Sequence, residues 1–358
     1  MKPKILIDSD IPYIQGVLDP LAEVCYLSAK AITPEACHDA QALIIRTRTS
    51  CNQDLLKGSQ VELIASASVG TDHINRYFCK ANNIEVANAP GCNAWAVVQW
   101  VTSALYLVTR QLPIPLSQLR IGIVGCGAVG RRLHATLTAL GIHTILVDPP
   151  LQAQGGKGYS SLAMVQQFCD IITFHVPLTY SDESRWPTYH LADEHFFYGL
   201  ERRPYILNSS RGGVVDDYAL LRALERKQIR GYCLDVYEHE EDVSPALLEP
   251  ALLATPHIAG YSIEGKQAAT AAVLQAVCSH FGWPTLLPKL EDDETQRPFN
   301  AGLSISDLAK TYDIRKDSLA LKAQPYALEQ LRSHYVYRHD WQAYEFGNRK
   351  LFVQDPLG

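Results

Sequence analysis

Three short fragments in the second half of the chain contain residue types that suit an acid–base reaction. Arg211 lies in the fragment 208–213, two glutamates lie in the fragment 235–240, and His257 lies in the fragment 255–260. Each fragment follows a short apolar run that is typical of a strand. We therefore expect all three beyond the carboxyl ends of successive strands, which is where open α/β sheets bind their ligands.

These residue types suit the oxidation of a 2-hydroxy acid. An imidazole ordinarily titrates at about 6.5, so His257 can accept the hydroxyl proton near neutral pH. A carboxylate on the other ring nitrogen would fix the tautomer, and Glu238 and Glu240 both compete for this role. Arg211 would offer its planar fork to the substrate carboxylate. A lone histidine after a strand is more often a packing residue, but the combination with arginine and glutamate favours catalysis.

A glycine motif upstream predicts a dinucleotide cofactor. The motif GxGxxG spans residues 125–130, directly after the expected strand 121–124 and at the start of an amphipathic helix, 131–140. Asp148 ends the next strand, where a carboxylate can bind the ribose hydroxyls and repel a 2′-phosphate, so NAD is favoured over NADP. The cofactor-binding residues expected from this motif are Gly125, Gly127, Ala128, Val129, Gly130 and Asp148.

The elements that must position these residues follow a βα rhythm. Apolar runs such as 4–8, 42–46 and 61–65 predict one parallel sheet, and further runs between 120 and 255 predict a second. We expect two Rossmann-like (doubly wound parallel sheet) domains, the first discontinuous, plus a small α+β C-terminal domain. The expected boundaries are a substrate-binding domain at 1–98 completed by 259–284, an NAD-binding domain at 99–258, and a C-terminal domain at 285–358.

Composition narrows the class of protein. The net charge of −6 argues against a nucleic-acid or membrane surface. The most apolar stretch, 94–108, is shorter than the roughly twenty residues that a membrane helix needs. The start of the chain has no secretory signal, and the nine cysteines lack metal-ligand spacing. We therefore expect a cytoplasmic protein with free thiols and no metal.

The three fragments together resemble the D-2-hydroxyacid dehydrogenase family. The resemblance implies catalytic roles for Arg211, Glu240 and His257, because the family's acid lies five residues after the aspartate that ends the strand. Glu241 stands where many relatives have proline. His175 matches a strand end that lines the cofactor cleft, where we favour a packing role. The resemblance adds these cofactor-binding residues: Val176, Ser209, Ser210, Arg211, Asp235 and Gly260.

Several stretches resemble one branch of that family more closely, among them 70–74, 88–94, 147–150, 256–266 and 312–317. This branch oxidises 4-phospho-D-erythronate to 2-oxo-3-hydroxy-4-phosphobutanoate in pyridoxal 5′-phosphate synthesis, and its members are homodimers that pair through a C-terminal domain. The resemblance implies a phosphorylated 2-hydroxy acid as substrate. The expected substrate-binding residues are Arg46, Thr47, Ser68, Val69, Gly70 and Tyr261, with Arg48 as a further candidate for the phosphate.

Two alternatives stay open from the sequence. The first is a dehydrogenase for another D-2-hydroxy acid, such as 3-phosphoglycerate or glycerate/hydroxypyruvate. The second is a protein that binds NAD as a sensor on the same fold, which the acidic composition and the lack of a docking tail disfavour.

Overall fold

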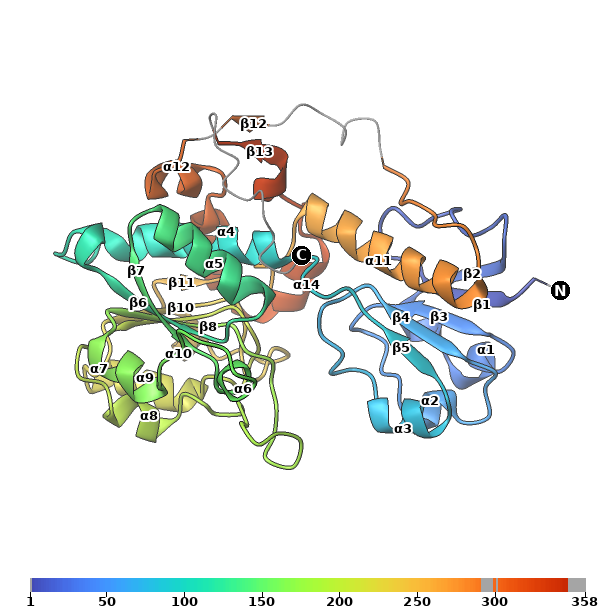
Figure 1. The fold of residues 1–358 in the computed structure, drawn as a ribbon, viewed down its shortest axis with the longest axis horizontal. Helices are drawn as coiled ribbons and strands as arrows, with labels where there is room; N and C mark the ends of the chain where they lie inside the picture. The colour runs from blue at the N-terminus through green and yellow to red at the C-terminus, as the bar shows by residue number, and fades with distance from the viewer. Residues whose placement is uncertain (1, 291–298, 301, 347–358) are drawn as a thin grey trace. The chain divides into compact units, whose positions relative to one another are not determined.

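The computed structural model describes residues 2–290, 299–300 and 302–346. The chain divides into two compact units, which are drawn in Figure 1. The first unit comprises residues 1–93 and 262–297, and the second comprises residues 94–261 and 298–358. The first unit is thus built from two separate stretches of the chain.

The first unit contains a parallel sheet of five strands in the order β2-β1-β3-β4-β5. The alternating side chains of its strands are buried on both faces, which explains the continuous apolar runs in the sequence. Ile5 and Ile7 of β1 belong to one core cluster, and Leu6 between them belongs to the other. The strands are β1 (Lys4–Asp8), β2 (Glu23–Leu27), β3 (Ala42–Ile45), β4 (Leu63–Ser66) and β5 (Glu85–Ala87).

Helices cover both faces of this first sheet. The long helix α11 (Ile263–Phe281) packs Val273, Leu274 and Val277 against the face that carries Ile5 and Ile7. It begins at Ser262, whose hydroxyl accepts a hydrogen bond from the Gly265 N–H, and it ends at Gly282 in the left-handed conformation. The other face is covered by α1 (Pro34–Cys37), α2 (Gln53–Leu56) and α3 (Arg76–Ala81).

The second unit contains a parallel sheet of six strands in the order β11-β10-β9-β8-β6-β7. The chain starts at β6, next to one edge, adds β7 at that edge, and then returns past β6 to build the rest of the sheet from β8 to β11. This change of direction creates the crevice where doubly wound sheets bind ligands. The strands are β6 (Arg120–Val124), β7 (His143–Val147), β8 (Ile171–Phe174), β9 (Tyr205–Asn208), β10 (Gly231–Leu234) and β11 (Leu253–Ala254).

The faces of the second sheet are also covered by helices (Figure 1). The apolar stretch near residue 95 forms α4 (Ala94–Thr109), which packs with α5 (Ala128–Ala139) on one face. The opposite face is covered by α7 (Leu162–Phe168), α8 (Glu194–Tyr198), α9 (Asp217–Glu225) and α10 (Pro245–Leu248). The expected doubly wound α/β fold is confirmed.

The C-terminal segment of the second unit is helical with one small pair of strands. Leu308 and Tyr312 join the same core cluster as α4 and α5, and Leu321 joins the cluster on the opposite face. The elements are α12 (Ile305–Lys310), α13 (Ile314–Ala323), α14 (Leu328–Ser333), and the paired strands β12 (Phe299–Asn300) and β13 (Tyr344–Glu345). The described part of this segment therefore shares its core with the six-stranded sheet.

Two further expectations can be compared with the structure. Among the described residues, no helix has both the length and the apolar character that crossing a bilayer requires. The nine cysteines are free thiols, and most of them are buried.

Candidate active site

A pocket of about 420 Å³ lies at the carboxyl edge of the six-stranded sheet. It is lined by the end of β6, the start of α5, the end of β7 and the loop that follows β8. Most of its wall is apolar, and Asp148 and Arg131 bring charges to it. A concave, largely apolar pocket with a few polar groups suits the adenosine part of a dinucleotide.

The glycines of the motif 125–130 shape the edge of this pocket. Gly125 has a φ of +93°, and a Cβ there would lie 2.4 Å from the His175 carbonyl oxygen. A Cβ on Gly130 would lie 2.0 Å from the Gly125 carbonyl oxygen, so the helix can approach the strand only without one. Gly127 faces open space at the start of α5, where no side chain caps the helix. The unpaired N–H groups of this helix end can therefore donate hydrogen bonds to a pyrophosphate, which fits a dinucleotide.

Asp148 is placed at the pocket as the motif predicts. Its two carboxylate oxygens accept hydrogen bonds from the Cys126 N–H at 2.8 Å and the Leu151 N–H at 3.0 Å. It thereby caps α6 (Pro149–Ala153) and stays half-buried. The sequence neighbours of Asp148 include no arginine, but Arg131 from α5 reaches the same pocket. The Arg131 Nε is buried and has no hydrogen-bond partner among the described residues.

Other expected cofactor residues lie at neighbouring strand ends. Val176 lines the pocket directly after β8. The Ser209 hydroxyl follows β9 and is buried without a hydrogen-bond partner among the described residues, which makes it available to a ligand. Burial lowers the pKa of His175 to about 3, and its Nε2 lies 3.0 Å from the Thr173 hydroxyl. His175 is half-buried and lines the pocket, and its neutral ring suits the packing role in the cofactor cleft that the sequence favours.

Glu240 and His257 form a close pair after β10 and β11. The His257 Nδ1 lies 2.6 Å from the Glu240 Oε1, and both side chains are partly exposed. Burial alone would raise the pKa of Glu240, but the hydrogen bond and charge of His257, with the charges of Arg332 and Arg211, hold it below its ordinary value. An ionised Glu240 accepts a hydrogen bond from the Nδ1–H of His257 and leaves the Nε2 free to act as a base.

The backbone at His257 has an unusual conformation, with a φ of +57°. Asp235, which is almost fully buried, holds this loop in place. Its carboxylate accepts hydrogen bonds from the Thr255 hydroxyl at 2.6 Å and from the N–H groups of Ile258 and Ala259 at 2.9 and 2.8 Å. Burial raises the pKa of Asp235 to about 6 against the opposing effect of His257 and these donors. Asp235 was expected at the cofactor, and in this structure it positions the loop of His257.

The Arg211 loop follows β9 and touches the loop of Glu240. The Asn208 side chain shapes its turn, because its carbonyl accepts from Ser210 and its amide donates to the Arg211 carbonyl at 3.0 Å. A Cβ on Gly212 would lie 1.8 Å from the Tyr237 carbonyl oxygen. This contact brings the arginine loop directly against the loop that carries Glu240.

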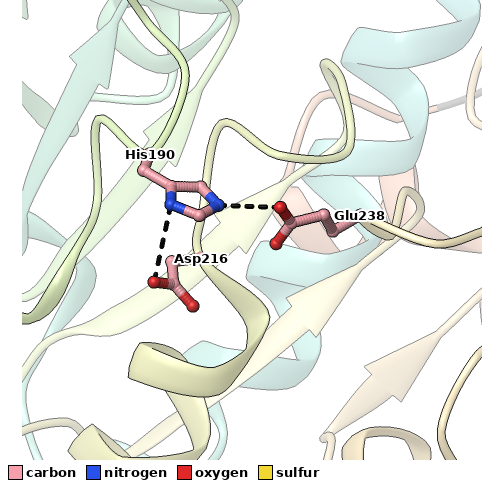
Figure 2. Close-up of side chains that lie close together, drawn as sticks. All are labelled: His190, Asp216 and Glu238. Carbon is pink, nitrogen blue, oxygen red and sulfur yellow. Dashed lines mark hydrogen bonds and ion pairs between the residues drawn. The ribbon is translucent and has the colours of Figure 1, made fainter.

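Glu238, the competing acid, points to a different histidine. Figure 2 shows His190 between two carboxylates: its Nε2 lies 2.8 Å from the Glu238 Oε1, and its Nδ1 lies 3.6 Å from the Asp216 Oδ2. The Tyr189 hydroxyl also donates to Glu238. His190 thus connects the loop before α8, the start of α9 and the loop after β10. Glu238 has a structural partner, and Glu240 is the acid beside His257.

The expected substrate residues of the first unit follow β3 and β4. The guanidinium of Arg46 forms a bidentate ion pair with Asp8 and a further contact with Asp10 at 2.6 Å. Thr47 and Arg48 are exposed after β3. The Ser68 hydroxyl bonds to the Gly70 carbonyl at 2.8 Å, and Val69 is exposed next to it. The carboxyl ends of these adjacent strands therefore bring the two loops to one edge of the first sheet.

Tyr261, the remaining substrate residue, belongs to the second unit and follows Gly260 in the loop of His257. Its hydroxyl lies 3.3 Å from the Nε of Arg332, which also contacts Glu240. Nearby, the half-buried Arg338 donates to the backbone carbonyls of this loop. Sequence reasoning missed both arginines, because they lie 71 to 92 residues from the groups that they contact and belong to no recognisable pattern.

Comparisons with known proteins agree with this geometry. The family model described as "D-isomer specific 2-hydroxyacid dehydrogenase, NAD binding domain" matches residues 99–259. The chain is 42% identical over 350 residues to erythronate-4-phosphate dehydrogenase of Bacteroides fragilis, covering 95% of this chain and 98% of that protein. It is 40% identical to the enzyme of the same name from Edwardsiella ictaluri, covering 95% and 93%.

A solved structure gives the same result for the fold. The D-lactate dehydrogenase of Aquifex aeolicus, in complex with NAD and lactic acid, matches with a TM-score of 0.66 and 26% identity over 78% of this chain and 96% of that one. The glycine motif, its pocket and the family match assign NAD as the cofactor of the second unit. The chain belongs to the D-isomer specific 2-hydroxyacid dehydrogenase family and, within it, to the erythronate-4-phosphate dehydrogenases.

Proposed function

We propose that this chain oxidises 4-phospho-D-erythronate to 2-oxo-3-hydroxy-4-phosphobutanoate with NAD, a step of pyridoxal 5′-phosphate synthesis. The observation that carries the reaction is the Glu240–His257 pair with the Arg211 loop, at the carboxyl edge of the sheet that also holds the dinucleotide pocket. Near full-length similarity to erythronate-4-phosphate dehydrogenases supports the choice of substrate.

The chemistry assigns one role to each side chain of the catalytic set. NAD, when bound, accepts the hydride that leaves C2. His257 takes the proton of the C2 hydroxyl at its Nε2, while Glu240 stabilises the resulting positive charge through Nδ1. Arg211 binds the substrate carboxylate and the C2 oxygen, which holds C2 in position. The C2–H and O–H bonds break, the C2=O bond forms, and the proton finally passes to solvent.

The substrate's anionic groups need fixed donors. We assign the phosphate to the first unit, where Thr47, Arg48 and Ser68 offer side-chain donors and the backbone at Val69 and Gly70 offers further ones; Tyr261 of the second unit stays an expected substrate residue. Arg46 is a weaker candidate, because Asp8 and Asp10 already engage its guanidinium. The phosphate is remote from C2, so its binding energy can support turnover as well as affinity.

We further propose that the protein is a homodimer that pairs through its C-terminal segment and works in the cytoplasm. The Tyr- and Arg-rich tail and the relatives' similarity over this segment support this assignment. Light scattering on the full chain tests it, and a monodisperse monomer at assay concentration would contradict it.

The test of the substrate is NADH formation from a small panel of acids. We expect erythronate, which lacks the phosphate, to have a kcat/KM roughly 10²-fold lower, because charge-assisted hydrogen bonds are lost. 3-Phosphoglycerate is one carbon shorter and should also be poor. Equal rates with erythronate and 4-phosphoerythronate would overturn the assignment and favour a general 2-hydroxyacid dehydrogenase.

A further inference from the structure

The catalytic pair has a third partner from the C-terminal segment. Arg332 lies on α14, and its side chain is only 15% exposed. Its Nη1 lies 3.0 Å from the Glu240 Oε2, while the other oxygen of the same carboxylate lies 2.6 Å from the His257 Nδ1. Glu240 is thus engaged on both oxygens, by the imidazole on one side and by a guanidinium on the other.

The position of Arg332 determines how its charge acts on His257. The Arg332 Nη1 also lies 3.5 Å from the His257 Nδ1. That nitrogen carries the hydrogen that it donates in the hydrogen bond to Glu240, so it has no lone pair with which to accept a hydrogen bond from arginine. The guanidinium of Arg332 is therefore a fixed positive charge beside the His257 ring, which itself becomes positive when it takes a proton. Glu240 favours the protonated ring, and Arg332 opposes it.

The surroundings keep Arg332 in this place. Its Nε contacts the Tyr261 hydroxyl at 3.3 Å, and Glu329, one turn earlier on α14, lies 3.8 Å away. Burial alone would lower the pKa of Arg332, but Tyr261, Glu240 and Glu329 raise it overall, so the guanidinium stays charged.

A second arginine fixes the loop that carries His257. Arg338 donates to the carbonyls of Ile258, Ala259 and Tyr261 at 3.0, 2.6 and 2.9 Å, and its guanidinium stacks on the Tyr312 ring at 4.1 Å. The C-terminal segment therefore holds both parts of the pair: Arg338 holds the backbone of the His257 loop, and Arg332 holds the carboxylate of Glu240.

We propose that Arg332 is a positioning residue of the reaction: it aims Glu240 at His257, and its fixed positive charge opposes the positive charge that the imidazole gains when it accepts the substrate proton. This proposal rests on the proposed function for its kinetic readout. The titratable and charged groups around the pair are Arg211, Asp235, Tyr237, Tyr261, Glu329 and Arg332.

The test compares pH profiles of kcat/KM for oxidation. Arg332→Gln should move the acidic limb of the kcat/KM profile to higher pH by about half a unit or more, because the His257 ring then takes a proton more easily. At pH values below that limb, kcat/KM should be lower than in the unchanged protein by about three-fold or more. Glu240→Gln should move the limb to lower pH, and Arg332→Lys, which keeps the charge, should restore most of the original profile. Protonation of Asp235 cannot produce these opposite directions.

Arg315→Gln is the matched control, because Arg315 is exposed on α13 in the same segment and pairs only with Asp313 among the described contacts. Its profile and activity should equal those of the unchanged protein. Thermal melting of each variant checks that the fold is retained.

A readout without substrate separates the two proposals. NMR of the histidine rings, with the His257 signal assigned by its loss in His257→Asn, should show the ring protonating at higher pH in Arg332→Gln. A loss of activity that is equal at every pH, an unchanged NMR titration, or a change confined to the KM of the phosphorylated acid would overturn the role of Arg332. Failure of the substrate assignment would leave the NMR result intact.

Discussion

At the scale of single residues, His257 supplies the base of the site, and other residues hold its backbone in an unusual conformation. His257 has a positive φ, which is uncommon outside glycine. Asp235 holds the loop through three donors, and Glu240 orients the ring. The residue types alone left Glu238 and Glu240 as competitors, and the spacing of the family that the sequence resembles favoured Glu240. The structure shows the partner of the other acid, because Glu238 contacts His190, which is distant in the chain.

His257→Asn should abolish most turnover and leave NAD binding unchanged. Asparagine tolerates the positive φ at this position, so the loop should keep its shape while the base is lost. We expect kcat to fall by about 10²–10⁴-fold. Steady-state kinetics and calorimetric titration of NAD measure the two effects, and His239→Asn, an exposed histidine of the Glu240 loop, serves as the control. A well-folded variant with normal kcat would remove His257 from the reaction.

Asp148→Ala should weaken NAD binding and narrow the preference for NAD over NADP. The carboxylate no longer repels a 2′-phosphate, and Arg131 from the same pocket becomes the dominant charge there. Dissociation constants for both cofactors measure the change, with the exposed Asp39→Ala as control. If the ratio of the two constants stays the same, Asp148 does not select the cofactor.

At the scale of elements, the site depends on loops that follow neighbouring parallel strands. The positions of these strands could be predicted, since each forms an apolar run followed by polar residues; the run at 120–124, for example, is β6. The contact between the Arg211 loop and the Glu240 loop could not, because it depends on a missing Cβ at Gly212. The arginines of the C-terminal segment were also unpredictable, since no periodicity links residues 332 and 338 to residues 240 and 257.

Gly212→Ala should reduce turnover more than stability. The added Cβ would lie 1.8 Å from the Tyr237 carbonyl oxygen, so the two loops must move apart and misplace Arg211 relative to Glu240. A displacement of this order can cost up to about 10²-fold in rate. Gly141→Ala is the control: its Cβ would meet nothing within 4 Å, and its φ of +72° should cost about 1–2 kcal/mol of stability while kcat is kept. Equal kcat in the two variants would show that the contact is unimportant.

At the scale of the whole molecule, the C-terminal segment is part of the NAD-binding unit. Its helix α12 packs against α4, and Leu308 is fully buried in the core cluster that includes α5 and the six-stranded sheet. The sequence suggested a separate appendage here, because a charged stretch precedes the segment and its composition changes. Composition cannot reveal that apolar residues on both sides of such a stretch enter one core. The segment therefore supports the site twice, through its core residues and through its arginines.

The final prediction follows from this shared core. Leu308→Ala should destabilise the second unit by about 2–5 kcal/mol, because it removes buried apolar volume and leaves a cavity between α12 and α4. Since the NAD pocket belongs to the same unit, saturating NAD should raise the melting temperature of the variant and of the unchanged protein alike. Leu319→Ala on α13 is the matched control, because Leu319 is 68% exposed and its loss should change the melting temperature little. Calorimetry with and without NAD measures both. Calorimetry could instead show that Leu308→Ala lowers the melting temperature of only one separate unfolding transition, which NAD does not shift. In that case the segment folds as an independent domain, and the shared core does not hold the NAD-binding unit together.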